Sequence, residues 1–471
     1  MGGGGLLQLV AYGAQDIYLT GNPQITFFKV VYRRHTNFAI ESIQNTFQGT
    51  SSFGNRVVCQ IARNGDLIWK TYLQIDLPEL STFSQYVAYA GLRILKDVEV
   101  EIGGQRIDKH YSHWMYIWNE LSLPIGKRYG YQLLTGDNLP AGSSTYTVYV
   151  PLEFWFCRNV GLALPLIALQ YHEVKININY ETSDKMLTCG SFTSGADLAN
   201  GSLWVDYIFL DTDERRRYAQ LSHEYLIEQL QHTGDESISS TQNNIKLNFN
   251  HPCKELIWVV QPTQNKYYDW TNYSAFSSSN YTVNYSSTSN PFLLTNQSSL
   301  AAAKTYLEAN SINYLIKGFT YNGPTNSNFN GGSNYSSNLF TGYTEEILES
   351  LNPYVSATTY GFSNLVDNAK IILNGQDRFY VRAGQYFNVV QQYQHHTNIS
   401  HNPGINVYSF ALKPEDHQPS GTLNLSRIDT AVLALTTSYV NSSNPANVKI
   451  YAVNYNILRI MSGMGGLAYS N

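Results

Sequence analysis

The chain has 471 residues, of which 43% are hydrophobic and only 14% charged, and its formal net charge is −5. This length exceeds what one hydrophobic core usually organises and suits two or three. The charged fraction lies well below the roughly 25% that is usual, and the 37 Tyr residues combine apolar area with a polar tip. Both features favour a protein that buries much of its surface against neighbours. The acidic balance argues against a nucleic-acid-binding protein, which usually shows a basic face, and the one basic run, 215–217, is interpreted as a solvated or locally paired cluster.

The spacing of the cysteines and the composition of the first residues predict a protein of a reducing compartment. Cysteines 59, 157, 189 and 253 show neither a CxxC motif nor metal-ligand spacing. No apolar run approaches the roughly 18 residues of a membrane span, so no transmembrane segment is expected. The first residues lack the charged and apolar regions of a signal peptide. Residues 1–24 are therefore predicted to form a flexible N-terminal arm.

The first predicted strands begin after the arm. Apolar residues alternate over 57–61 and again over 69–77, where Thr71, Leu73 and Ile75 alternate with polar neighbours. A period of two is typical of a half-buried antiparallel strand. Asn64-Gly65 lies between these runs and predicts a hairpin turn, because both residue types tolerate positive φ angles.

A strand at 98–102 precedes the one helix that we predict in this half, at 110–121. Trp114, Ile117, Trp118 and Leu121 fall on one helical stripe there. Further strands are predicted at 146–156, 173–180 and 203–210. These elements belong to a first domain spanning residues 25–212.

Residues 213–243 are predicted to link two domains, with a short helix at 213–221 and an ambiguous helix or strand at 223–230. The second domain spans 244–471. Within it, 263–362 is dense in Ser, Asn, Tyr and Gly, and we expect an ordered surface tower because aromatic residues are frequent. Strands are predicted in this domain at 245–249, 256–260, from 369, and at 407–412, 431–436 and 448–457.

The two halves resemble each other. VEVEIGGQR at 98–106 has a counterpart, AKIILNGQDR, at 369–378: a strand pattern, a two-residue turn ending in Gly, then Gln and Arg. Weaker echoes in the same order link 173–178 with 430–435 and 204–210 with 451–458. About eight short strands in each half, with few helices, predict an all-β protein of two tandem eight-stranded antiparallel jelly-roll sandwiches.

Several long runs closely resemble the major capsid proteins of large double-stranded DNA viruses, in particular the branch of algal and giant viruses. Apart from 263–362 and short loops, nearly the whole chain takes part. The runs that carry the resemblance are 8–16, 19–29, 32–38, 102–111, 162–172, 204–212, 223–230 and 459–469.

This resemblance implies a structural role. It implies two tandem jelly rolls in each chain, homotrimers with a six-cornered outline that tile an icosahedral shell, contacts with neighbouring capsomers, and minor capsid proteins below the shell. It also implies an inner membrane, no direct contact with nucleic acid, and assembly in the host cytoplasm. Two alternatives stay open: a minor or vertex paralogue of the same fold, and a β-sandwich whose 263–362 tower binds host surface glycans.

No nucleophile–base pair, cofactor motif or metal-ligand set stands out, so an enzyme is not expected. His395, His396 and His401 have no Cys or acidic partner nearby in sequence, and we interpret them as a solvated loop. Asn-x-Ser/Thr triplets are candidate glycosylation sites, although such triplets usually stay unmodified in a cytoplasmic protein. They begin at Asn272, Asn280, Asn284, Asn296, Asn334, Asn398 and Asn441.

Overall fold

The computed structural model describes residues 4–469, except for 12, 82–83, 138, 140–144, 190, 264–269, 271–313, 317–318, 322–363, 401, 403 and 439. The chain forms two compact units, Met1–Phe38 and Ala39–Asn471. The first unit contains the short helices α1 (Gly4–Val10) and α2 (Ile17–Thr20). Among the described residues, no helix has both the length and the apolarity that crossing a bilayer requires.

Most of the predicted tower at 263–362 lies outside the described residues. Within it, β15 (Tyr314–Ile316) and β16 (Phe319–Tyr321) form an antiparallel pair.

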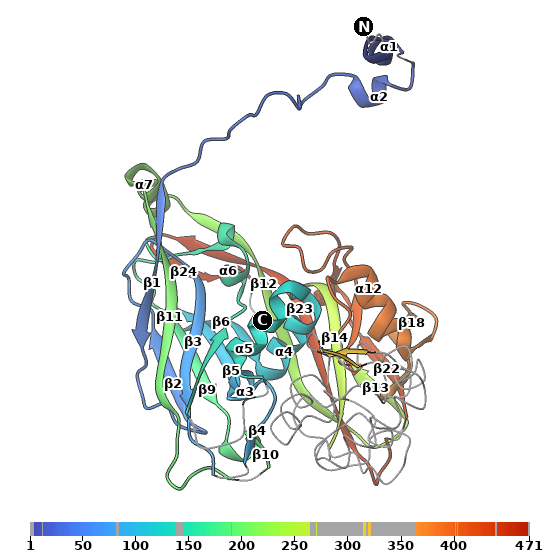
Figure 1. The fold of residues 1–471 in the computed structure, drawn as a ribbon. Coiled ribbons are helices and arrows are strands. Elements are labelled where there is room, and N and C mark those ends of the chain that lie inside the picture. Colours follow the sequence, from blue (N-terminus) through green and yellow to red (C-terminus); the bar gives the residue numbers. More distant parts are fainter. Residues whose placement is uncertain are drawn as a thin grey trace. The chain divides into compact units, whose positions relative to one another are not determined.

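The second unit contains two β-sandwiches that lie side by side (Figure 1). In the first, one sheet has the order β1 (Phe38–Thr46), β11 (Ala199–Leu210), β3 (Leu67–Leu77), β7 (Tyr146–Pro151), with β8 (Leu164–Pro165) beside β3. The facing sheet has the order β2 (Arg56–Gln60), β9 (Val174–Tyr180), β5 (Leu95–Ile102), β6 (Gln105–Tyr111). The short strands β4 (Gln85–Tyr86) and β10 (Leu187–Cys189) pair separately.

The second sandwich repeats this arrangement. One sheet has the order β12 (His223–Ile238), β23 (Ala446–Met461), β14 (Pro252–Pro262), β20 (Asn406–Ser409), with β21 (Leu423–Asn424) and β24 (Met464–Leu467) at its margins. The facing sheet has the order β13 (Gln242–Lys246), β22 (Ala431–Thr437), β17 (Val366–Leu373), β18 (Gln376–Asp377), with β19 (Arg382–Ala383) beside β17.

Both sandwiches have the same topology. When the eight main strands of each are counted in chain order, the sheets read 1-8-3-6 and 2-7-4-5 in both halves. This pattern is a jelly roll, so the predicted pair of tandem jelly rolls is confirmed. The echoes at 173–178 and 430–435 fall on the seventh strands, and those at 204–210 and 451–458 on the eighth strands.

The repeated turn motif also occupies equivalent positions, between the fourth and fifth strands of each sandwich. Gly103 and Gly104 have φ angles of 58° and 85°, and Asn374 and Gly375 have 50° and 80°. Two consecutive positive φ angles are the signature of the type I′ turn, whose twist matches that of the flanking strands. This is why each turn needs Gly or Asn.

Helices lie mainly in the connections between strands. The stripe predicted at 110–121 corresponds to α4 (Ser112–Ser122), in which Trp114, Ile117, Trp118 and Leu121 are all buried. The other helical segments that the structure describes in the second unit are α3 (Ala90–Arg93), α5 (Ile125–Thr135), α6 (Trp155–Arg158), α7 (Thr212–Gln220), α12 (Gln391–His395), the π-helix η4 (Tyr386–Val390), and the 3₁₀ turns η1 (Val160–Leu162), η2 (Ser183–Lys185) and η5 (Leu425–Arg427).

Two local predictions in the first half are wrong. Asn64-Gly65 is not a hairpin turn, because β2 and β3 belong to different sheets and this segment crosses between them. The strand predicted at 146–156 ends at Pro151, and α6 follows. Here the aromatic residues Trp155 and Phe156 are buried by a helical turn.

The predicted linker at 213–243 is largely regular structure. The helix expected at 213–221 is α7, where Arg215 of the basic run contacts Asp66 at 3.0 Å. The ambiguous segment 223–230 is a strand, part of the long β12 that pairs with β23. Residues from 223 onward therefore belong to the second sandwich.

Candidate functional site: the interface between the two jelly rolls

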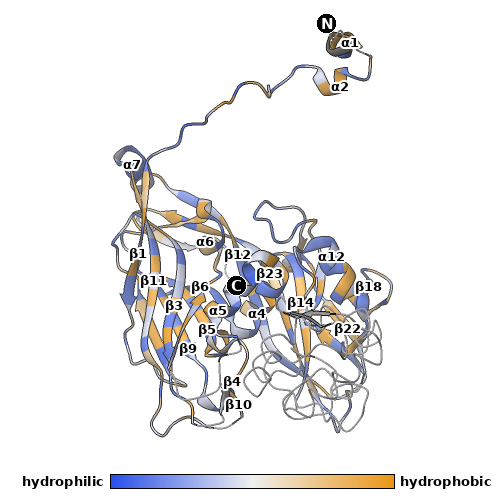
Figure 2. Ribbon diagram, in the orientation of Figure 1, coloured by the Kyte–Doolittle hydropathy of each residue, from blue (hydrophilic) through white to orange (hydrophobic). Residues whose placement is uncertain are grey.

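In the sheet β12-β23-β14-β20, the strands β23, β14 and β20 are buried on both faces along most of their length. In β14, every residue from 253 to 260 is buried. Leu256 and Trp258 contribute to the core of the second sandwich, while Ile257 and Val259 join the hydrophobic cluster of the first. Burial on both faces explains why β14 reads as an almost continuous apolar run, whereas β3 alternates, as the hydropathy colours show for the first sandwich (Figure 2).

Aromatic rings fill the contact between the sandwiches. Trp114 of α4 lies 5.6 Å from Tyr451 of β23, measured between ring centroids. His232 of β12 stacks on Tyr451 at 4.7 Å and meets the edge of Tyr111 at 5.1 Å. Aromatic pairs contribute about 0.5–1.5 kcal/mol each beyond the area that they bury. This layer holds the first sandwich against the outer face of the second.

Hydrogen bonds between side chains and backbone also join β6 and β12 directly. The Gln229 side-chain amide donates to the Ile107 carbonyl, and the Leu230 N–H donates to Asp108 Oδ1 at 3.0 Å. Asp108 in turn contacts His110 Nε2 at 3.0 Å. These contacts fix the register of one sandwich on the other.

A buried ion network crosses the same interface. Glu228 of β12 contacts Arg158 of the first sandwich at 3.1 Å and Lys254 of β14 at 2.8 Å. Lys254 is fully buried and donates to the Pro414 carbonyl at 2.6 Å. Burial alone would raise the pKa of Glu228, but the hydrogen bond from His417 and the charges of Lys254 and Arg158 outweigh it and lower the pKa to about 2. Glu228 is therefore ionised throughout the neutral range.

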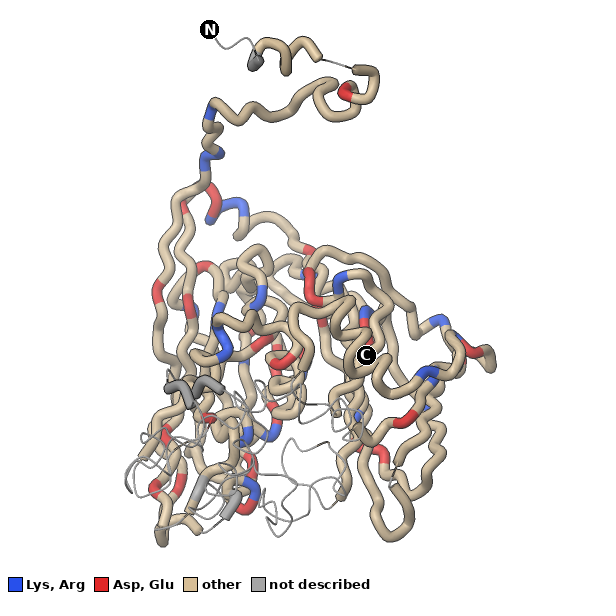
Figure 3. The backbone as a smooth tube through the Cα atoms, turned by 45° about the vertical axis from the view of Figure 1, so that its right-hand side comes forward, with Lys and Arg blue, Asp and Glu red and all other residues tan. Residues whose placement is uncertain are grey.

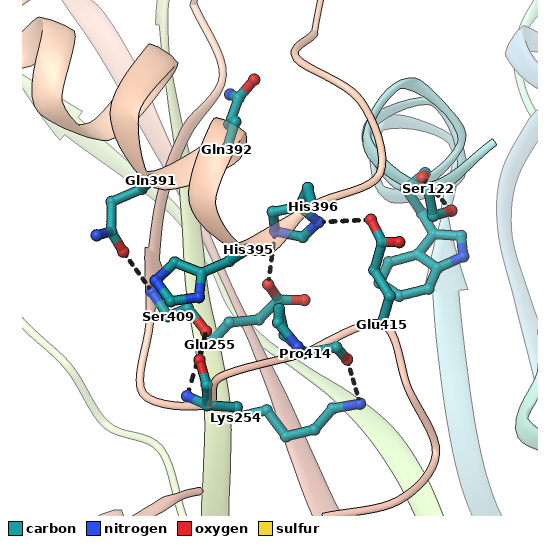
Figure 4. Close-up of polar contacts among 12 residues, drawn as sticks. Ser122, Lys254, Glu255, Gln391, Gln392, His395, His396, Ser409, Pro414 and Glu415 are labelled. Carbon is teal, nitrogen blue, oxygen red and sulfur yellow. Dashed lines mark hydrogen bonds and ion pairs between the residues drawn. The ribbon is translucent and has the colours of Figure 1, made fainter. Parts of the chain in front are cut away.

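A second buried cluster lies beside Lys254 (Figure 4). The fully buried His396 contacts Glu255 at 3.0 Å through Nε2 and Glu415 at 2.9 Å through Nδ1. Burial by itself lowers the pKa of His396, but the two carboxylates outweigh it and raise the pKa to about 9. His396 is thus a charged bridge between β14 and the segment after β20.

The interpretation of His395, His396 and His401 as a solvated loop is wrong for His396. Its acidic partners are Glu255, which lies on β14 far away in the sequence, and Glu415, which follows β20. The spacing of residues around His396 in the sequence could therefore not reveal them. His395 places Nδ1 3.1 Å from the Leu412 carbonyl, and His401 lies outside the described residues.

The cluster continues into the first sandwich through Asn398. Its N–H donates to the Leu121 carbonyl at 3.0 Å, and its side-chain amide donates to the Leu123 carbonyl. The amide nitrogen that a glycan would occupy therefore takes part in the interface. Asn441 lies in an exposed turn, where Oδ1 accepts from the Ser443 N–H at 2.9 Å. The candidates Asn272, Asn280, Asn284, Asn296 and Asn334 lie outside the described residues.

The C-terminal hairpin of β23 and β24 closes the far end of the interface. The Tyr171 N–H donates to the Gly463 carbonyl at 3.0 Å, and His172 Nδ1 lies 2.9 Å from the Gly465 carbonyl. The Leu467 N–H donates to Gln105 Oε1 at 3.3 Å. Three of the runs that carry the family resemblance, 102–111, 162–172 and 459–469, therefore meet in space.

Sequence matches assign the family. Residues 26–211 match the family described as "Major capsid protein N-terminus", and residues 214–466 match "Large eukaryotic DNA virus major capsid protein". The chain belongs to the major capsid proteins of large eukaryotic DNA viruses. It is 48% identical to the major capsid protein of Phaeocystis pouchetii virus, over 99% of this chain and all of the relative. It is 44% identical to that of Paramecium bursaria Chlorella virus 1, with the same coverage.

Solved structures agree with this assignment. The VP54 structure from Paramecium bursaria Chlorella virus 1 superposes with a TM-score of 0.72 at 38% identity, covering 95% of this capsid protein and all of VP54. The Faustovirus major capsid protein, at 13% identity and a TM-score of 0.63, shares the fold. It covers 96% of this chain and 94% of that one.

Sequence reasoning missed the charged residues of the interface. Glu228, Lys254, Glu255 and Glu415 carry no motif. A signal was nevertheless present: Lys254 and Glu255 directly precede the apolar run of β14, and charges within a strand buried on both faces must be paired.

Proposed function

We propose that this capsid protein forms homotrimeric capsomers with a pseudo-hexagonal outline, which tile the icosahedral outer shell of a large DNA virus. The observation that carries the proposal is the repeated jelly roll joined by a buried interface, since three such chains supply six similar corners. The match to the quasi-atomic model of the Paramecium bursaria Chlorella virus 1 capsid, at a TM-score of 0.71, supports it. The relatives are capsid proteins, which supports a structural rather than an enzymatic role.

The division of the chain follows from the same proposal. Residues 1–24 act as an arm, residues 25–37 connect it to the first jelly roll, which extends to 212, and the second jelly roll contains the 263–362 insertion. Partners are further copies of the chain, minor capsid proteins under the shell, and host surface glycans at the insertion. Acidic and basic residues are interspersed along the described chain (Figure 3), which agrees with a shell that makes no direct nucleic-acid contact. Assembly takes place in the host cytoplasm.

Mass measurement tests the capsomer. We expect light scattering on the purified protein to give about three times 53.1 kDa, because three chains of two equivalent sandwiches supply the six corners of one capsomer. A mass of one chain at all concentrations contradicts the proposal. A minor or vertex paralogue is separated from a shell protein by copy number, since a shell-forming protein must dominate purified particles.

The N-terminal arm gives a second prediction. Deleting residues 1–24 should leave folded trimers but block growth of the lattice, because the arm contacts a neighbouring capsomer rather than stabilising its own fold. The deletion removes only part of the first compact unit, Met1–Phe38. Electron microscopy of assembly reactions checks it, with the full-length chain as control. Closed shells from the truncated chain would show that the arm is dispensable.

A further inference from the structure

The internal repeat identifies equivalent positions on the two sandwiches. In the first, Trp204 of the eighth strand pairs with Tyr72 of the third. In the second, Tyr451 of the eighth strand pairs with Ile257 of the third. The flanking residues Val205 and Ala452 point into the core of their own sandwich, so the four paired residues all lie on outer sheet faces.

These equivalent faces differ in burial. Tyr451 and Ile257 are 1% and 0% exposed, because the connection that follows β6 covers them with α4 and Trp114. On the first sandwich, Tyr72 and Trp204 are only half-buried. Among the described residues, the outer face of β1-β11-β3-β7 therefore lacks the cover that its counterpart has within the chain.

The uncovered face has the composition of an interface. Tyr72 stacks parallel to Trp204 at 6.3 Å between ring centroids and lies 6.2 Å from Tyr149, which is 36% exposed. Trp204 Nε1 donates to Gln74 Oε1 at 2.7 Å. Rigid aromatic rings with satisfied polar tips are typical of the centres of protein interfaces.

A complementary surface lies on the second sandwich. The connection between β18 and β20 corresponds in the fold to the connection between β6 and β7 that contains α4. It contains η4 and α12, and it exposes Tyr380, at 84%, together with Val381 and Val390. Residues 378–405 include Arg378 and Arg382 and no acidic residue.

Charge also favours this match. Two carboxylates, Asp76 and Asp206, and one ammonium, Lys70, lie on the outer face of the first sandwich beside the aromatic group, so its charge is net negative. The connection offers the opposite sign, because residues 378–405 contain Arg378 and Arg382 and no carboxylate. Opposite charges on two apolar surfaces favour one orientation of docking.

We propose that the outer face of β1-β11-β3-β7 in one copy receives the β18–β20 connection of the next copy. The contact repeats between chains what α4 does within a chain, with Tyr72, Tyr149 and Trp204 taking the part of Ile257 and Tyr451. It is heterologous, so each copy offers one donor and one acceptor surface and the assembly closes as a ring. This inference rests on the proposed trimer and names the surfaces that build it.

A charge placed in the acceptor face tests the proposal. Tyr149→Arg should raise the concentration at which trimers dissociate at least tenfold, because it removes an aromatic ring from the contact and places a cation opposite Arg378 and Arg382 of the next copy. Gln60→Arg is the matched control, since Gln60 is an exposed strand residue on the outer face of the other sheet of the same sandwich. It should leave the dissociation midpoint unchanged. Light scattering over a dilution series measures both.

The outcomes separate the inference from the proposed function. A wild-type chain that stays monomeric overturns the trimer itself. Wild-type trimers whose midpoint is the same in both variants overturn only the assignment of this face. Because Tyr149→Arg could instead fail to fold, thermal unfolding of the variant is measured alongside.

Hydroxyl-radical footprinting of wild-type trimers supplies an answer that needs no variant. Within one chain Tyr380 is 84% exposed and Tyr171 is 75% exposed. We expect Tyr380 and Tyr149 to be oxidised several times more slowly than Tyr171 in the trimer. Equal oxidation rates for Tyr380 and Tyr171 in the trimer overturn the proposal. Protection of Tyr380 that appears only in assembled particles also overturns it, because the surface would then contact another capsomer or a minor capsid protein.

Discussion

Replacing Glu228 by Leu should destabilise the capsid protein by about 3–5 kcal/mol at neutral pH. Glu228 is the buried carboxylate between Arg158 and Lys254. Its removal leaves the fully buried Lys254 ammonium without its counter-ion, and the desolvation cost of an unpaired charge exceeds the loss of one contact. Urea unfolding at fixed protein concentration measures the change, because trimer formation would otherwise shift the apparent stability.

Glu224→Leu is the matched control. Glu224 lies on the same strand and contacts Arg459 at 2.8 Å, but both side chains are more than half exposed. Exposed pairs contribute about 0–1 kcal/mol, so this variant should unfold close to the wild type. A double variant, Glu228→Leu with Lys254→Met, should recover most of the loss, since an apolar pair of similar volume can replace a buried ion pair. Equal effects of Glu224→Leu and Glu228→Leu would exclude the network as a major element of the interface.

Replacing His396 by Ala should cost a similar amount, about 3–5 kcal/mol, because it leaves Glu255 and Glu415 facing each other without the cation between them. His395→Ala is the neighbouring control. Its ring is partly exposed and makes one contact with a backbone carbonyl, so a change within about 1 kcal/mol is expected. A destabilisation of His395→Ala as large as that of His396→Ala would show that the effect belongs to the loop rather than to the charge.

The pH dependence gives His396 a separate signature. Its pKa is raised from 6.5 to about 9 in the folded protein. The stabilisation is therefore fully present below pH 6.5 and is lost as pH rises through 9, a change of about 3 kcal/mol. The free energy of unfolding of the wild type should fall between pH 6 and pH 10. The part of this fall that comes from His396 should be missing in His396→Ala. Parallel curves for the two proteins would contradict the assigned role.

At the acidic end, Glu415 behaves in the opposite sense. Burial alone would raise its pKa, but hydrogen bonds from His396 and Thr397 outweigh it and lower the pKa. The stabilisation that Glu415 contributes to the folded state is fully present at pH values above the ordinary pKa of a Glu side chain. It is lost as the pH falls through the lowered pKa of the folded state. The cluster is therefore most stabilising between the ordinary titration range of Glu and pH 6.5, where Glu415 is ionised and His396 is protonated.

Local sequence determined the strand content, the repeat and the helix α4. The period of two over 69–77 and the stripe of Trp114, Ile117, Trp118 and Leu121 record which side chains meet an apolar environment, and this depends on residues close in sequence. The type I′ turns at Gly103 and Asn374 were equally readable, because positive φ angles require particular residue types.

Tertiary structure alone decided which surfaces meet. The segment 223–230 is a strand because β23, more than 200 residues away, supplies its hydrogen-bonding partner, and Asn64-Gly65 crosses between sheets because β2 and β3 pair with other strands. His396 is a buried cation because Glu255 approaches from β14. The alternation of apolar residues in a strand predicts that one face is buried. It does not predict which residues cover that face, since those residues lie far along the chain. The partners of the interface therefore had to come from the fold.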